Sequence, residues 1–151
     1  MPAIRFEIDG RQVEARPGES VFEVAQREGI SIPHLCHSGE PGYRPDGNCR
    51  TCMVEIEGER TLAASCIRQP VDGMVVRTAT PRADKARKLV FELLLADQPP
   101  RDASPDPSSR LWTWAEAVGQ TESRFPRLRE TEPDTSHPAM WVNLDACINC
   151  T

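Results

Sequence analysis

The sequence predicts an α+β fold in which about five short strands surround one helix, followed by a second helix and a proline-rich, largely irregular extension. Three observations support this prediction. Apolar and polar residues alternate in short segments of the first half, a capped helical segment stands among them, and half of the fourteen prolines lie between Pro99 and Pro138. Alternation is typical of half-buried strands, whereas clustered prolines oppose regular structure.

The first two strands are expected to form a hairpin. Ile4, Phe6 and Ile8 alternate with charged residues, which indicates a strand with one buried face. Asp9 and Gly10 follow, and this dipeptide is typical of a tight turn between antiparallel strands. Residues 12–15 supply the returning strand.

A short helix is expected over residues 21–28. Ser20 is followed three residues later by Glu23, a capping box in which each side chain satisfies a backbone amide at the helix start. Gly29 is placed to end the helix in a left-handed conformation. The apolar stripe is expected to belong to the core: Val21, Phe22, Val24 and Ala25.

Three further strands are expected at residues 53–57, 62–65 and 73–78, with a turn at Gly58. Together with the hairpin and the helix they make a β-grasp arrangement. From Pro81 the apolar period becomes helical, which predicts a second helix over residues 81–97. Its buried face is expected to contain Ala83, Ala86, Leu89 or Val90, Leu93 and Leu94. Its solvated face, or a face that docks an acidic partner, is expected to contain Arg82, Lys85, Arg87 and Lys88.

Residues 98–140 are expected to be a proline-rich linker, because four prolines between Pro99 and Pro107 exclude a long helix there. Trp112 and Trp114 lie in this polar stretch. Two exposed tryptophans are costly in water, so both are expected to pack on the body of the domain or on a neighbouring part absent from the chain.

The overall composition excludes several classes of partner. The net charge of −5 argues against nucleic acid, which binds basic surfaces. The longest apolar run, residues 89–96, contains Glu92 and is too short to span a bilayer. The first ten residues are charged and alternating rather than a secretion signal, so a cytoplasmic location with reduced thiols is expected.

The most informative motif is a set of four cysteines with asymmetric spacing: Cys36, Cys49, Cys52 and Cys66. In a reducing compartment such thiols serve as metal ligands. Only two residues separate Cys49 from Cys52, so these two thiolates can bind adjacent irons. The loop before Cys49 is rich in glycine and proline and can wrap a small iron-sulfur cluster. Arg50, inside the pair, is either a cation that favours the reduced cluster or an exposed loop residue.

Three alternatives compete for these cysteines. A structural zinc site, which would make the chain an interaction module without redox function, usually draws its ligands as two short-spaced pairs. Disulfides require an oxidising compartment. A Rieske centre would use two histidines, but His34 and His37 flank Cys36 and are expected to be solvent-facing loop residues. No nucleophile-base pairing or phosphate-binding glycine motif is present, so no catalytic residue is assigned.

The segment IPHLCHSGEPGYRPDGNCRTCMVEIEG, followed by LAASC, resembles the N-terminal 2Fe-2S ferredoxin-like domain shared by complex I large-subunit homologues, NAD-reducing hydrogenases and related formate dehydrogenases. In that group the following helix leads into a motif of one histidine and three cysteines that binds a 4Fe-4S cluster. Residues 96–115 contain neither histidine nor cysteine here. Together with SHPAMWVNLDACINCT near the end, this departure resembles the alpha subunit of molybdenum-containing, NAD-dependent formate dehydrogenases.

This resemblance implies specific ligands and domains. Cys36, Cys49, Cys52 and Cys66 would hold a 2Fe-2S cluster, with Cys36 and Cys49 on one iron and Cys52 and Cys66 on the other. Residues 1–80 would be the 2Fe-2S domain, 81–97 its following helix, 98–140 a linker, and 141–151 the truncated start of a 4Fe-4S domain with Cys147 and Cys150 as ligands. The chain would be an electron carrier, and the molybdopterin domain that oxidises formate would belong to the full-length subunit. Flavin/NAD and 2Fe-2S subunits would be its partners.

Overall fold

The computed structural model describes residues 3–128 and 130–148, which form two compact units, Met1–Arg87 and Lys88–Thr151. The first unit contains a mixed five-stranded sheet in the order β2-β1-β5-β3-β4. Its strands are β1 (Ile4–Ile8), β2 (Arg11–Ala15), β3 (Met53–Ile56), β4 (Ala63–Ala64) and β5 (Val75–Arg77). Strand β1 pairs antiparallel with β2 and parallel with β5, whereas β3 pairs antiparallel with both β5 and β4. The expected mixed α+β arrangement is confirmed.

The first hairpin follows the sequence pattern closely. Phe6 pairs with Val13, and both side chains are buried. Asp9 and Gly10 both have positive φ, 49° and 83°, as a tight turn between two twisted strands requires. The Asp9 carboxylate also accepts hydrogen bonds from the backbone N–H and the hydroxyl of Thr78. The turn is therefore joined to the residue that follows β5, three residues before the start of α2 (Pro81–Ala96).

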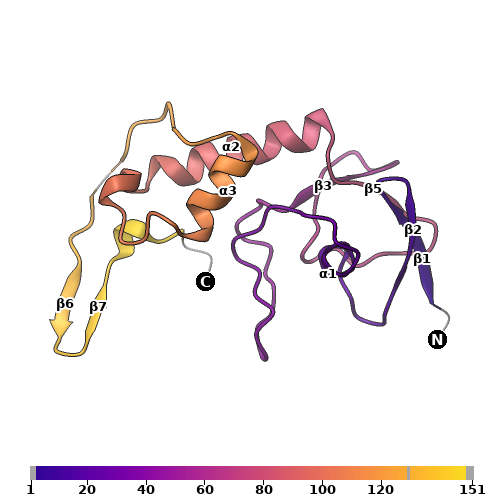
Figure 1. Cartoon of the computed structure of the whole chain (residues 1–151), viewed down its shortest axis with the longest axis horizontal. Helices are drawn as coiled ribbons and strands as arrows, with labels where there is room; N and C mark the ends of the chain where they lie inside the picture. The colour runs from indigo at the N-terminus through magenta and orange to yellow at the C-terminus, as the bar shows by residue number, and fades with distance from the viewer. Residues whose placement is uncertain (1–2, 129, 149–151) are drawn as a thin grey trace. The chain divides into compact units, whose positions relative to one another are not determined.

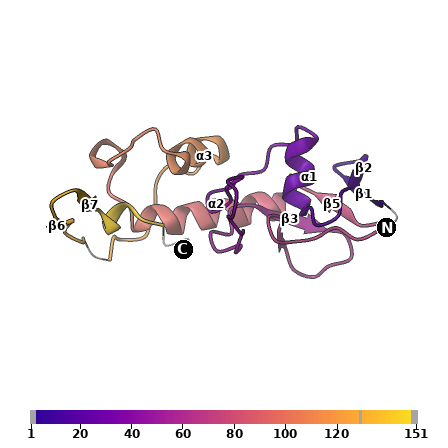
Figure 2. The same ribbon diagram turned by 90° about the horizontal axis from the view of Figure 1, so that it is seen from below.

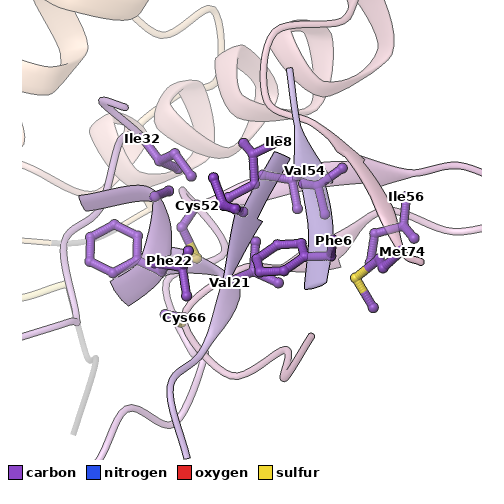
Figure 3. Close-up of a cluster of buried hydrophobic side chains, with 14 of the residues drawn as sticks. Phe6, Ile8, Val21, Phe22, Ile32, Cys52, Val54, Ile56, Cys66 and Met74 are labelled. Atoms are coloured by element: carbon purple, nitrogen blue, oxygen red, sulfur yellow. The ribbon is translucent and has the colours of Figure 1, made fainter. Parts of the chain in front are cut away.

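Helix α1 (Val21–Arg27) packs against one face of the sheet (Figures 1 and 2). The capping box is present: the Ser20 hydroxyl accepts from the Glu23 N–H at 3.2 Å, and the Glu23 carboxylate accepts from the Ser20 N–H at 2.7 Å. Gly29 has φ of 74°. The buried residues of α1 join strand residues in one core cluster, which also includes Cys52 and Cys66 (Figure 3).

Helix α2 begins as expected, but its buried face differs from the prediction. The buried residues of α2 are Ala83, Arg87, Phe91, Glu92 and Leu95, while Leu89 and Leu93 are 40% and 57% exposed. The expectation that Arg87 lies on the solvated face was wrong. The Arg87 guanidinium donates hydrogen bonds to the backbone carbonyl of Met53, and these bonds allow the charged side chain to be buried.

The second unit contains more regular structure than a linker. It includes helix α3 (Arg110–Val118), the strands β6 (Asp134–His137) and β7 (Met140–Val142) of a two-stranded sheet, and the short helices η1 (Arg101–Ala103) and η2 (Leu144–Ala146). The largely irregular extension is thus not confirmed. No proline lies between Pro107 and Pro126, so helix α3 can form, and Gly119 ends it with φ of 70°.

The tryptophans of α3 differ in environment. Trp112 is buried, and the Arg101 guanidinium lies 5.7 Å from its ring centroid, whereas Trp114 is half-buried. The contact between Arg101 and Trp112 is internal to the second unit, an arrangement that the sequence did not indicate. Among the described residues, no helix is both long and apolar enough to cross a membrane.

The capping box provides a test of the local fold. Ser20→Ala removes the oxygen that accepts from the Glu23 N–H, so the free energy of unfolding is expected to fall by about 1 kcal/mol. Urea unfolding followed by circular dichroism measures this loss. Ser31→Ala, at an exposed serine of the same unit, is the control and is expected to leave the unfolding midpoint unchanged. An equal loss in both variants would contradict the role of the cap.

Candidate metal centre

The four cysteines of the predicted site are all buried in the first unit. Their exposed fractions are 4% for Cys36, 7% for Cys49, and 1% for both Cys52 and Cys66. Cys36 and Cys49 belong to the long irregular segment between α1 and β3 (Figure 1, purple). Cys52 directly precedes β3, and Cys66 is the second residue after the end of β4. Thiols so shielded from water suit metal ligation better than exchange with external thiols.

The thiols stand in two pairs. The Cys36 N–H donates to the Cys49 sulfur at 3.5 Å, and the two side chains also share a hydrogen bond. The thiols of Cys52 and Cys66 share another. Cys66 interacts electrostatically with both Cys36 and Cys49, which places the two pairs in one site. Within the described part of the chain, no three His, Cys, Asp or Glu side chains are grouped as a single metal ion would require.

Hydrogen bonds from Ser65 set the separation of the second pair. Its backbone N–H and its hydroxyl both donate to the carbonyl of Cys52, at 3.1 and 2.8 Å. The carbonyl of Ser65 in turn accepts from the Phe22 N–H at 3.0 Å, at the start of α1. Because Ser65 precedes Cys66, these bonds hold Cys52 and Cys66 together and tie both to the helix.

The segment before β3 bends tightly around the first pair. Arg50 has φ of 56°, a left-handed conformation that is rare outside glycine. Thr51 is fully buried, and its hydroxyl oxygen lies 3.2 Å from the Cys49 sulfur. This turn directs Cys49 and Cys52 toward the same buried region and surrounds the sulfur of Cys49 with polar hydrogens.

The hydrogen bonds between thiols separate their acidities. The hydrogen bond with Cys66 lowers the pKa of Cys52 to about 6, although burial acts in the opposite direction. The same hydrogen bond raises the pKa of Cys66, and burial raises it further. Burial raises the pKa of Cys36. Burial also acts to raise the pKa of Cys49, but hydrogen bonds from Thr51 and Cys36 outweigh it, so the pKa of Cys49 is lowered. Each pair therefore contains one sulfur predisposed to be a thiolate, the form that binds metal.

The two histidines beside Cys36 were expected to face solvent, and the structure contradicts this expectation. His37 is buried and His34 half-buried, and their rings lie 4.5 and 4.8 Å from the Phe22 ring, measured between centroids. His34 Nδ1 is also 3.0 Å from the carbonyl oxygen of Ile32. The imidazole rings pack on an aromatic side chain of α1, a tertiary contact that local polarity does not indicate.

The structure also distinguishes the two arginines beside the site. Arg50, the cation considered from the sequence, is exposed. Arg87 is buried, and its guanidinium donates to the carbonyl of Met53, the residue after Cys52. The sequence offered one usable signal for Arg87, namely its position four residues from both Ala83 and Phe91 on the helix.

Of the two terminal cysteines, Cys147 is described and lies in the second unit. It is exposed, and its carbonyl accepts from the Gln98 side chain at 3.3 Å. Just before it, the Asp145 carboxylate binds the Arg127 guanidinium and the Thr131 N–H. Cys150 lies outside the described residues. The prediction that Cys147 and Cys150 are 4Fe-4S ligands in a longer protein therefore stays a prediction.

Comparison with known proteins agrees with this site. Residues 2–81 match a family described as a 2Fe-2S iron-sulfur cluster binding domain. The fold and the four buried cysteines define a 2Fe-2S ferredoxin-like domain, and the chain belongs to this family.

The relatives that match this chain are much longer than it is. An NADH-quinone oxidoreductase subunit of Rhizobium meliloti (strain 1021) is 35% identical over 97% of this chain and 18% of the relative. The mitochondrial NADH-ubiquinone oxidoreductase 78 kDa subunit of Candida albicans (strain SC5314 / ATCC MYA-2876) is 31% identical over 98% of this chain and 21% of the relative. The chain thus spans about a fifth of the length of these curated relatives.

A solved structure extends the likeness to both units. An NAD+-reducing NiFe-hydrogenase in its H2-reduced state matches 97% of this chain and 62% of its own, with a TM-score of 0.83 and 29% sequence identity. The chain is therefore related to subunits of NADH-quinone oxidoreductases and to this hydrogenase.

Gly47 tests how tightly the loop packs on the site. A Cβ there would lie 2.8 Å from Cδ1 of Ile67, the residue after Cys66, whereas a Cβ at Gly42 would meet nothing within 4 Å. Both glycines have positive φ, so alanine strains the backbone at either position. We expect Gly47→Ala to lower the iron bound per chain and the thermal midpoint more than Gly42→Ala does. Equal effects would show that the contact with Ile67 is unimportant.

Proposed function

We propose that this chain transfers single electrons through a 2Fe-2S cluster held by Cys36, Cys49, Cys52 and Cys66. The observation that carries the proposal is the pairing of four buried thiols inside a domain of the 2Fe-2S family. Cys36 and Cys49 would bind one iron, and Cys52 and Cys66 the other. The short contacts within each pair and the weaker electrostatic interaction between pairs support this division.

When bound, a 2Fe-2S cluster supplies reversible one-electron chemistry, with no atom or proton transferred to a substrate. The chain's own residues supply ligation, burial and hydrogen bonds. The Cys36 N–H and the Thr51 hydroxyl reach the Cys49 sulfur, and donors of this kind stabilise the extra negative charge of a reduced site. The hydrophobic core around Cys52 and Cys66 excludes water, and hydrogen bonds and charge interactions at the site are stronger where water is excluded.

Replacing each ligand separately tests the assignment. Cys36→Ser, Cys49→Ser, Cys52→Ser and Cys66→Ser are each expected to remove or destabilise the cluster, because a four-thiolate site then lacks one ligand. Protein purified without oxygen is expected to contain about two irons and two acid-labile sulfides per chain before substitution. In the 151-residue chain, Cys147→Ala, at an exposed thiol, is the control and should leave the visible spectrum unchanged.

The alternative is a zinc-stabilised interaction module. A single zinc ion would need the four thiolates arranged as a tetrahedron around one point, and the two-pair arrangement favours a two-iron core. Stoichiometric zinc without sulfide in the native protein would overturn the electron-transfer proposal.

We further propose that the domain serves as a relay in a multi-subunit redox enzyme, in a reducing compartment such as the cytoplasm. The named relatives support the relay role, since they are subunits of NADH-quinone and NADH-ubiquinone oxidoreductases. The particular enzyme proposed is an NAD-dependent formate dehydrogenase, with flavin/NAD and 2Fe-2S subunits as partners. Its support is the segment 96–115, which lacks histidine and cysteine, together with the final NLDACINCT. In the longer protein, Cys147 and Cys150 would bind a 4Fe-4S cluster, and a later domain would hold molybdopterin.

The choice of electron donor tests this second proposal. Protein produced from the complete gene in its native host is expected to have its iron-sulfur centres reduced on addition of formate, in the absence of NADH. Visible bleaching and the EPR signal of the reduced centres report the reaction. Reduction by NADH but not by formate, in a preparation that contains molybdenum, would contradict the formate proposal and leave the relay intact.

A further inference from the structure

Arg87 is the only arginine or lysine among the buried residues that the structure describes, and it is 6% exposed. Its Nε and Nη2 atoms donate to the carbonyl oxygen of Met53, at 3.1 and 2.7 Å. A forked contact of this kind fixes the guanidinium plane and holds the charge in one place. The positive charge is therefore fixed beside the residue that follows Cys52.

The carboxylates near Arg87 compensate its charge incompletely. Nη1 lies 3.4 Å from Asp84, but the Asp84 side chain is 53% exposed and water screens its charge. Asp9 also interacts electrostatically with Arg87, yet its carboxylate already accepts two hydrogen bonds from Thr78. Burying a cation with so little compensation is costly unless another negative group lies close by.

The cysteine site is a candidate for that negative group. Burial lowers the pKa of Arg87, and the negative charges of Asp84, Cys52 and Asp9 oppose this effect. Cys52 is joined to Met53 by a single peptide bond, so the carbonyl that anchors Arg87 belongs to the same turn of chain as a ligand. Four thiolates and a two-iron core carry a net negative charge that increases by one on reduction.

We propose that Arg87 is the buried countercharge of the cysteine site, and that its guanidinium stabilises the reduced over the oxidised state and so raises the reduction potential. This inference rests on the proposed 2Fe-2S function. One electron enters without a proton, so the more negative state gains more from a fixed cation. Arg87 does not ligate and is not catalytic. It is a positioning residue whose charge acts through space on the sulfur ligands.

The helix offers a matched control. Arg82 lies on the same helix, is half-exposed, and binds Glu55 and the carbonyl of Arg60. Arg87→Gln and Arg82→Gln each remove one positive charge from α2, but only the first removes a buried one. Arg87→Lys keeps the charge and loses the forked geometry, so it separates charge from hydrogen bonding.

The test is a redox titration of each variant, followed by visible absorbance and by the EPR signal of the reduced protein, after iron and sulfide have been measured. At the wild-type midpoint, Arg87→Gln is expected to decrease the ratio of reduced to oxidised protein at least about threefold, which is roughly 28 mV for a one-electron couple. Arg82→Gln and Arg87→Lys are expected to stay near the wild-type ratio. Since the charge is buried, the shift should persist in high salt.

The outcomes separate the inference from the function. If the wild-type protein lacks iron and sulfide, the proposed function fails first. If Arg87→Gln holds a complete cluster at the wild-type potential, or if Arg87→Lys shifts as far as Arg87→Gln, the function stands and the countercharge proposal fails. A further outcome is that Arg87→Gln and Arg87→Met both fail to assemble a cluster. In that case, a cluster in Arg87→Lys with the wild-type reduction potential supports the proposal, because only the positive charge is common to Arg87→Lys and the wild type. Failure of Arg87→Lys as well would make the residue purely structural and overturn the proposal.

Discussion

The two hydrogen bonds that Ser65 donates to the carbonyl of Cys52 are the constraint on which the site depends. They connect the segment before β3 with the segment after β4, and so bring together two ligands that are far apart in sequence. The Phe22 N–H continues this connection to helix α1 through the carbonyl of Ser65. Because Cys52 and Cys66 are also members of the hydrophobic core, the packing that stabilises the fold also positions half of the metal ligands.

Electrostatics then determines what the buried site can do. A cluster of thiolates removed from water is unfavourable unless polar hydrogens and cations lie near the sulfurs. The backbone N–H of Cys36 and the hydroxyl of Thr51 supply the first kind of group, at the Cys49 sulfur. Arg87 supplies the second, on the side of Cys52. The fold thus places different stabilising groups at the two pairs of ligands.

The features that the sequence predicted correctly depend on local chemistry. The Asp9-Gly10 turn, the Ser20 and Glu23 capping box, and the strand alternation around Phe6 each depend on residues close together in the chain. The missed features depend on distant contacts. Arg87 is buried because the Met53 carbonyl, thirty-four residues earlier, accepts its hydrogen bonds, and His37 is buried because Phe22 packs against it. In the C-terminal half, the high proline content concealed helix α3, which lies in the proline-free stretch between Pro107 and Pro126. The cysteine spacing indicated a cluster, but not the Ser65 bonds that arrange its ligands.

The central claim is that four cysteine sulfurs bind a two-iron core. X-ray absorption spectroscopy at the iron and zinc edges, on protein purified without oxygen, tests it most directly, because it reports the element, the ligand atoms and any neighbouring metal. We predict iron surrounded only by sulfur, with a second iron close by, and no stoichiometric zinc. Zinc bound by four sulfurs, or iron with nitrogen ligands from His34 or His37, would contradict the account.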